Sequence, residues 1–173
     1  TGVSEKVIRS YFQILEDTLL GSRIPPWRKA NNRKLVESEK IYLFDLGVAN
    51  FLANRKPKPG TPEFGKSFEH YILMELLAYK AYKNPELEIT YWRTSTGIEV
   101  GFILADMAVG IEVKSSSKIY NIDAKGLHVL QQEQNLKRSI LVCCETEKKM
   151  LSHNVECFPW QAFLNALWSD EII

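Results

Sequence analysis

The sequence has no long apolar run. Of its 173 residues, 45% are apolar and 25% are charged, and no uninterrupted apolar stretch approaches the roughly 18 residues of a membrane-spanning helix. The first residues also lack the pattern of a secretory signal peptide. We therefore expect no membrane partner. The composition indicates a globular chain with a substantial core, folded as one domain of ordinary size or two small ones.

Cysteine is also scarce, and the chain contains only Cys143, Cys144 and Cys157. The count is odd, and the spacing is not that of a known metal-binding motif. Cys143 and Cys144 lie in the apolar run 139–144, so we interpret them as small buried side chains. So few cysteines favour a reducing, cytoplasmic location.

A strong net charge is absent as well, because the whole chain carries +1. The charge is nevertheless uneven along the sequence. Residues 1–60 hold 11 Lys and Arg against 6 Asp and Glu, and residues 61–173 hold 11 against 15. Only the first part is therefore suited to a polyanion such as nucleic acid.

The first 60 residues have the element order of a winged helix. Ser4 is a suitable N-cap for a helix that runs to about Asp17, and apolar residues repeat behind it at helical spacing: Val7, Ile8, Tyr11, Phe12 and Leu15. A Pro-Pro-Trp turn at 25–27, a basic loop at 28–34 and a strand over 40–44 follow. In a winged helix the loop would form the wing. An ordinary amphipathic helix and a solvated hairpin tip are the competing interpretations.

Four basic residues of this loop are candidates for contacts with nucleic-acid phosphates: Arg28, Lys29, Arg33 and Lys34. Asp45 can cap a short helix from Leu46 to about Asn54. The basic, proline-rich stretch 55–60 is typical of a linker, so we predict a winged-helix-like remainder over 1–60 and a second domain over 61–173. Because the chain begins without methionine, we expect a fragment of a longer protein.

The longest predicted helix begins at Thr61, the N-cap, and Pro62 and runs to about Lys83. Its apolar residues cover most of the circumference, so we expect it to be largely buried. Glu69 lies within the apolar arc. A carboxylate in a buried stripe needs a partner, which makes Glu69 a candidate functional residue.

A predicted hairpin forms the centre of the second domain. Strands are expected over 97–104 and 109–116, and a further strand over 88–93 precedes them. In the second hairpin strand Glu112 and Lys114 face the same way, about 6.6 Å apart. A carboxylate and an ammonium so placed suit metal-assisted hydrolysis. The competing interpretation is a surface salt bridge.

The rest of the domain is predicted to alternate between helix and strand. A helix begins near Asp123 and ends near Asn135, and strands follow over 139–144 and 151–158. A helix over 159–168 closes the chain. The fold class is therefore α/β (α+β), with a central mixed sheet flanked by helices.

The segment Gly60–Ser67 matches the phosphate-loop pattern G-x-x-x-x-G-K-S, but its context contradicts that function. A phosphate loop follows a buried strand, whereas here the proline-rich linker precedes it. Pro62 has no N–H for a phosphate, and Glu63 would repel one. We therefore expect no nucleotide in this chain.

Along nearly its whole length the chain resembles the C-terminal region of prokaryotic AAA-type ATPases. This region is a domain of unknown function related to the PD-(D/E)xK, restriction-endonuclease-like superfamily. The resemblance rests on 7–20, 25–28, 40–47, 65–77, 92–104 and 112–116. It implies an N-terminal ATPase module before Thr1 as a partner, a winged-helix remainder, and a restriction-endonuclease-like sheet that could contact DNA.

The resemblance also implies site residues. Glu69 matches the helical acid of the superfamily, and Glu112 and Lys114 match its Glu-x-Lys pair, with Mg²⁺ or Mn²⁺ as the implied cofactor. Where the family has a metal-binding Asp, this chain has Gly101, which offers no side-chain ligand. Glu99, two positions earlier, is the candidate substitute ligand beside Glu112, and Asp106 in the turn is expected to be too distant.

Three functions follow from these residues. The first is a metal-dependent nuclease that uses Glu69, Glu112 and Lys114, with Glu99 as a replacement ligand. The second is a non-catalytic module that binds nucleic acid or a partner of the attached ATPase, and Gly101 favours it. The third is a structural or oligomerisation role. The position of Glu99 separates the first two, because a Glu99 that pairs with a lysine argues against a nuclease.

Overall fold

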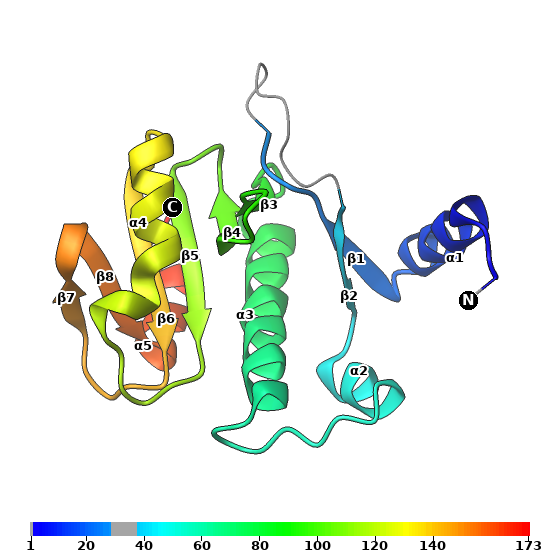
Figure 1. Ribbon diagram of the computed structural model, residues 1–173, viewed down its shortest axis with the longest axis horizontal. Helices are drawn as coiled ribbons and strands as arrows, with labels where there is room; N and C mark the ends of the chain where they lie inside the picture. Colours follow the sequence, from blue (N-terminus) through cyan, green and yellow to red (C-terminus); the bar gives the residue numbers. More distant parts are fainter. Residues whose placement is uncertain (1, 29–37) are drawn as a thin grey trace.

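The computed structural model describes residues 2–28 and 38–173. Its larger part is a six-stranded mixed sheet with the strand order β3-β4-β5-β6-β8-β7 (Figure 1). Antiparallel pairing joins β3 to β4 and β4 to β5, while β5, β6 and β8 are parallel and β7 is antiparallel to β8. The strands are β3 (Ile89–Arg93), β4 (Glu99–Leu104), β5 (Val109–Lys114), β6 (Arg138–Cys143), β7 (Lys149–Leu151) and β8 (Val155–Pro159). This confirms the predicted mixed sheet.

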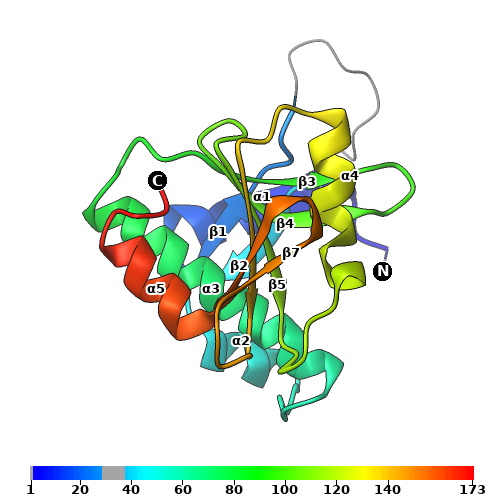
Figure 2. The same cartoon turned by 90° about the vertical axis from the view of Figure 1, so that its left-hand side faces the viewer.

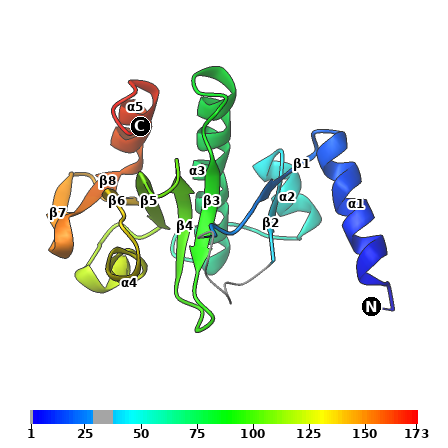
Figure 3. The same ribbon diagram turned by 90° about the horizontal axis from the view of Figure 1, so that it is seen from above.

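Helices cover both faces of this sheet, which gives two separate cores (Figures 2 and 3). On one face lie α3 (Pro62–Tyr82) and α5 (Trp160–Trp168), and they enclose a core that includes Leu76, Ile111 and Phe163. On the other face lies α4 (Lys125–Glu133), whose Leu127 packs with Leu141 and others. Adjacent residues of β6 alternate between the two cores, as the period of a strand requires.

The longest helix begins as the sequence predicts. Thr61 Oγ1 accepts a hydrogen bond from the Phe64 N–H at 3.2 Å, and Pro62 stands at the first helical position. The segment that matches the phosphate-loop pattern is thus the first turn of α3, preceded by a loop rather than by a strand.

A smaller unit precedes the large sheet. It consists of α1 (Glu5–Asp17), the antiparallel pair β1 (Gly21–Ile24) and β2 (Lys40–Leu43), and α2 (Leu46–Leu52). Asp45 caps α2 by accepting a hydrogen bond from the Val48 N–H at 2.7 Å. The first helix, the strand over 40–44 and the short helix after Asp45 lie where they were predicted, and membership of the winged-helix group stays a prediction.

The small unit joins the edge of the large sheet through the backbone that follows β1. The Trp27 N–H donates to the Tyr91 carbonyl at 2.6 Å, and the Tyr91 N–H donates to the Pro25 carbonyl at 3.1 Å. These bonds pair residues 25–27 with β3, the edge strand of the large sheet. The indole Nε1 of Trp27 also donates to Asp106 Oδ1 at 2.8 Å, so the turn of the hairpin takes part in the junction.

Two element boundaries differ from the prediction. The helix predicted from Asp123 begins as a 3₁₀ turn, Asn121–Ala124, in which Asp123 accepts a hydrogen bond from the Tyr120 N–H. The strand predicted over 151–158 is divided, because His153 and Asn154 have φ values of 58° and 55° between β7 and β8. Left-handed backbone cannot continue a strand.

Within the described residues, we find no helix that combines the length and the apolar character needed to cross a membrane.

Candidate functional site

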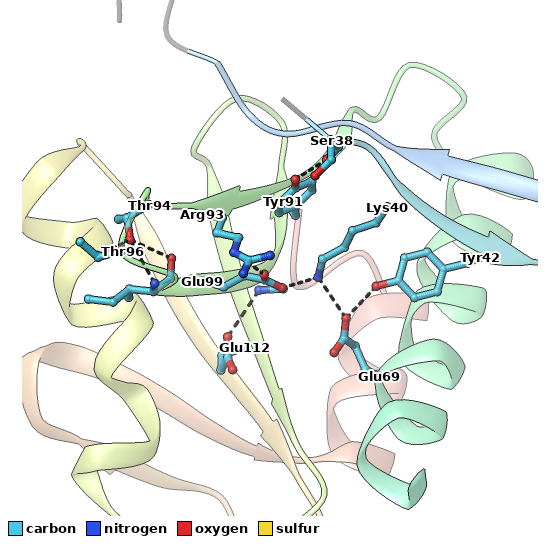
Figure 4. A network of polar contacts seen from close by, with 12 residues as sticks. Ser38, Lys40, Tyr42, Glu69, Tyr91, Arg93, Thr94, Thr96, Glu99 and Glu112 are labelled. Carbon is cyan, nitrogen blue, oxygen red and sulfur yellow. Dashed lines mark hydrogen bonds and ion pairs between the residues drawn. The ribbon is translucent and has the colours of Figure 1, made fainter. Parts of the chain in front are cut away.

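The candidate site lies where α3, β2 and the first hairpin strand meet (Figure 4). Glu69 projects from α3 and Glu99 begins β4, and the side chain of Lys40 from β2 reaches both. Lys40 Nζ lies 3.3 Å from Glu69 Oε1 and forms an even closer ion pair with Glu99 Oε1. One ammonium therefore joins two carboxylates from different parts of the chain.

Aromatic side chains complete the surroundings of this ammonium. Tyr42, two positions after Lys40 on β2, donates its hydroxyl to Glu69 Oε1 at 2.7 Å. The ring of Tyr91 lies under Lys40 Nζ, 5.0 Å from ring centroid to nitrogen, within the range of a cation–π contact. Lys40 Nζ is thus held by two carboxylates and one aromatic face.

The neighbouring carboxylates raise the pKa values of both Lys40 and Tyr42. Burial alone would lower the pKa of Lys40, but the neighbouring Glu69 and Glu99 outweigh it and raise that pKa. Burial, together with Glu69, raises the pKa of the Tyr42 hydroxyl. Lys40 is therefore a permanent cation at neutral pH and Tyr42 a permanent hydrogen-bond donor.

Glu99 also contacts a second cation. Arg93 Nε, on the neighbouring strand β3, lies 3.7 Å from Glu99 Oε2. Both carboxylate oxygens of Glu99 therefore face cationic side chains. A Glu99 that pairs with a lysine argues against a nuclease, and Glu99 pairs with Lys40.

A β-bulge explains why Glu99 turns toward α3. Thr90 pairs with Ile103 but Trp92 pairs with Val100, so β4 has one residue more than β3 in this interval. Gly101 lies in it. Because a bulge interrupts the alternation of faces, the two-residue spacing of Glu99 and Gly101 does not place them on one face of the sheet.

Glu112 and Lys114 lie on the opposite face of the sheet from α3. In the register of β5 with β6, Glu112 is paired with Leu141 and Lys114 with Cys143, both on the side of α4. Lys114 Nζ lies 2.7 Å from Glu112 Oε1, and the Gly101 N–H donates to Glu112 Oε2 at 3.4 Å. Burial raises the pKa of Glu112 despite the opposing effect of Lys114.

In the described residues the three predicted acids form no compact group of ligand atoms, although Glu69 is close enough to help raise the pKa of Glu112. Three acidic, histidine or cysteine side chains with ligand atoms within 4.8 Å of one another occur once in the described residues, at Cys143, Glu145 and Cys157. Glu69, Glu99 and Glu112 do not form such a group. Asp106 bonds to Trp27 and takes no part in the candidate site.

Lys40 and Tyr42 are the site residues that the sequence did not reveal. The strand 40–44 is predicted to follow the wing loop, and its alternation places Lys40 and Tyr42 on one face. Glu69 was expected to need a partner, and that need was the available signal. The partner lies 29 residues earlier in the chain, a separation that no local pattern encodes.

A cleft of about 560 Å³ opens beside Lys40 and Glu69, between β2, α2 and α3. Arg55 and Lys66 stand at its exposed rim, and His70 in its wall contacts the Leu43 carbonyl through Nε2 at 2.8 Å. Apolar residues of β2, α2 and the C-cap of α2 also line the cleft: Ile41, Leu43, Ala49, Leu52 and Ala53.

Of the predicted phosphate contacts, the structure describes Arg28, which is exposed beside a groove of about 720 Å³ between α1 and β1. Lys29, Arg33 and Lys34 lie outside the described residues. In the same groove Arg23 pairs with Glu16 at 2.7 Å and with Glu39 at 3.2 Å.

Comparison with known families and proteins gives the following matches. The profile of a Domain of unknown function (DUF4143) matches residues 64–163, and a second Domain of unknown function (DUF8612) matches residues 1–59. Two uncharacterized proteins, Mb2031c of Mycobacterium bovis and Rv2008c of Mycobacterium tuberculosis, are each 30% identical over 120 residues. That alignment covers 66% of this chain but 26% of each relative, so the chain spans about a quarter of their length. No solved structure matches.

Proposed function

The chain belongs to the family described as Domain of unknown function (DUF4143), and we propose that it is a non-cleaving binding module of a longer AAA-type ATPase. In this proposal the sheet has the nuclease-like architecture without a working metal centre. The ion pair of Lys40 with Glu69 and Glu99 is the observation that carries the proposal.

A lysine ammonium between two carboxylates competes directly with a divalent cation. A metal ion would have to displace Lys40, whose side chain is 22% exposed and held on three sides. Like charges a few ångströms apart at a partly buried site repel strongly. Lys40 and Arg93 together balance the charge of the two carboxylates that could attract Mg²⁺ or Mn²⁺.

Gly101 leaves the position of the expected metal-binding Asp without a side-chain ligand. Carboxylate oxygens are the ligands that Mg²⁺ and Mn²⁺ prefer, and position 101 supplies none. Of the carboxylates implied by the resemblance, Glu112 is left to bind a cation, and its partner Lys114 already occupies Oε1. The Oε2 atom of Glu112 accepts a hydrogen bond from the Gly101 N–H, so a lone carboxylate with both oxygens engaged is a poor metal site.

The binding surface of this module is proposed to be the apolar side of α1. Val7, Ile8, Tyr11 and Ile14 follow helical spacing and are 38–63% exposed, and α1 has no buried residue. The helix carries two basic and three acidic residues, which does not suit a nucleic-acid backbone. We therefore favour a protein partner, the ATPase module that the resemblance implies, over nucleic acid.

A specific observation supports the alternative of an active nuclease. The Glu112–Lys114 pair and the Gly101 N–H at its carboxylate retain the Glu-x-Lys arrangement. An active enzyme would use Glu69, Glu112 and Lys114 with Glu99 as substitute ligand, and would require Lys40 to leave Glu99 when the metal enters.

DNA cleavage tests the proposal. We expect this chain to leave supercoiled and single-stranded DNA intact with Mg²⁺ or Mn²⁺, and Glu112→Gln to be indistinguishable from it. Metal-dependent cleavage by this chain that Glu112→Gln abolishes would establish the nuclease instead. The control variant separates such cleavage from a contaminating nuclease.

Docking through α1 is tested separately in the full-length protein. We expect Ile14→Lys to weaken association of this module with the ATPase module, whereas Lys6→Gln on the same helix leaves it unchanged. Both side chains are exposed, so each variant should fold normally. Equal binding by both variants would contradict the proposed surface.

A further inference from the structure

Two cysteines and a glutamate gather on the α4 face of the sheet, away from the candidate site. Cys143 ends β6 and Cys157 lies in β8, and both side chains are fully buried. Glu145 follows β6, with its side chain 15% exposed. One ligand atom of each residue lies within 4.8 Å of the other two. The group could not be recognised in the sequence because its three members come from two strands and a turn.

The distance between the two thiols fits a shared metal ion. Cys143 Sγ and Cys157 Sγ are 3.5 Å apart. Two thiolates bound to one tetrahedral Zn²⁺ at about 2.3 Å lie about 3.8 Å apart. The thiols therefore need to move by only a few tenths of an ångström to hold such an ion.

The strand register disfavours a disulfide between the same residues. Cys157 is paired with Leu141, and Cys143 with Pro159, so the cysteines are offset by two positions. With strands about 4.8 Å apart and a two-residue offset of about 6.6 Å, the Cα atoms lie about 8 Å apart, whereas disulfides usually require less than about 7 Å. A metal bridge accommodates this separation and a direct S–S bond does not.

Glu145 is positioned as a third ligand. Its Oε1 accepts hydrogen bonds from the Ile119 N–H at 2.5 Å and from Lys149 Nζ at 2.7 Å. Lys149 is itself fixed by the Ile119 carbonyl at 2.8 Å. In the described part of the chain both hydrogen bonds end on Oε1, which leaves Oε2 for an ion. Metal-binding carboxylates are typically oriented by such outer contacts.

We propose that Cys143, Cys157 and Glu145 form a binding site for a thiophilic divalent cation, with Zn²⁺ as the ion that best fits two sulfur ligands and one oxygen. Three anionic ligands around a dication leave one negative charge, and the ammonium of Lys149 balances it. Water completes a four-coordinate site, reached through a hollow of about 310 Å³ that Glu145 and Lys149 line.

The third cysteine provides a matched control. Cys144 is the next residue in the chain, but it packs with the core on the opposite face of the sheet. Cys144 lines an apolar pocket with Phe64 and Trp160, and it also borders the hollow that Glu145 and Lys149 line. Cys144→Ser therefore changes the same chemical group without removing a proposed ligand.

Titration with Co²⁺, and then with Zn²⁺ in competition, tests the proposal on this chain. We expect one equivalent of Co²⁺ to produce a thiolate-to-cobalt charge-transfer band and to release two thiol protons, and we expect Zn²⁺ to remove the band without further proton release. Cys143→Ser and Cys157→Ser should abolish the band, and Cys144→Ser should retain it. Lys149→Met should weaken binding by roughly 10- to 100-fold.

The spectrum of the unaltered protein keeps the test decisive even if a buried cysteine variant fails to fold. Absence of a charge-transfer band at saturating Co²⁺ would overturn the proposal. A band that survives Cys143→Ser or disappears in Cys144→Ser would also contradict it. Glu112→Gln should leave the band unchanged, which separates this site from the candidate site on β5.

Discussion

The two regions of the molecule are held together in different ways. Among the described residues, Ile24 is the one large apolar side chain of the first 60 that is buried, while residues 61–173 supply the rest of both cores. Neither α1 nor α2 has a buried residue. The large sheet is stabilised by its own apolar interior, and the small unit is attached through backbone pairing at Tyr91 and the ion pairs of Lys40.

This difference explains why the candidate site lies at the junction. A polar attachment needs charged partners on the large sheet, and Glu69 and Glu99 are those partners. Carboxylates that resemble catalytic residues in the sequence thus act in the structure as anchors for β2. Because α1 packs weakly, its apolar side chains stay exposed, and they form the surface that we propose for a partner.

Truncating one phenylalanine in the large sheet domain and one in the small unit gives the largest expected difference in stability. Phe163 of α5 is fully buried in the core that α5 shares with α3, whereas Phe51 in α2 is 83% exposed. We expect Phe163→Ala to lower the free energy of unfolding by about 3–5 kcal/mol, and Phe51→Ala to change it by less than about 0.5 kcal/mol. Chemical denaturation measures both, and similar losses would contradict the division.

A matched pair of glycines tests how closely the large sheet is packed. A Cβ on Gly126 would lie 2.2 Å from the Glu99 carbonyl oxygen, whereas a Cβ on Gly65 would lie 3.4 Å from Ser115 Oγ. We expect Gly126→Ala to cost about 1–3 kcal/mol or more, because α4 must move from β4. Gly65→Ala in α3 should be neutral or stabilise by up to about 1 kcal/mol. Thermal unfolding distinguishes the two variants, and equal unfolding midpoints would contradict the close approach of α4 to β4.

Removal of the anchoring ammonium should loosen the junction without unfolding the sheet. Lys40→Met leaves Glu69 and Glu99 facing each other, and since their side chains are about 30% exposed, we expect a loss of only about 1–2 kcal/mol. Amide hydrogen exchange should accelerate in β2 and stay slow in β5. Lys66→Met at the rim of the same cleft is the control, expected to leave both strands unchanged.

The smallest effect concerns the pH dependence of stability. Because burial raises the pKa of Glu112, the folded state keeps that proton to a higher pH than the unfolded chain, whose carboxyl titrates near 4.5. The contribution of Glu112 to the free energy of unfolding therefore falls as pH rises from about 4.5 through the raised pKa. We expect Glu112→Gln to lack this decline. Parallel pH profiles of the two proteins would show that Glu112 is not perturbed.

Much of the fold could be predicted from the sequence because its signals are local. Thr61 and Pro62 mark the start of α3, and the alternation of Ile111 and Val113 with Glu112 defines β5. The division of β7 from β8 could not be predicted, since His153 and Asn154 adopt left-handed backbone in a stretch whose apolar pattern continues.

The site was harder to predict than the fold because its residues meet through tertiary contacts. Glu69 and Glu112 were identified by residue type, but their positions on opposite faces of the sheet depend on strand register. The bulge at Gly101 and the arrival of Lys40 from β2 have no signature in a single sequence. Residue types thus indicated which side chains matter, and only the structure indicated their partners.

Mn²⁺ titration calorimetry tests the proposal that Lys40 takes the place of a metal ion. Gly101 has room for a side chain, since its Cβ would lie 3.5 Å from the Ile111 carbonyl oxygen. We predict no binding by the unaltered chain, little or none by Gly101→Asp, and measurable binding by the Gly101→Asp, Lys40→Met double variant. Binding by the unaltered chain that Glu112→Ala abolishes would contradict the account and restore the nuclease.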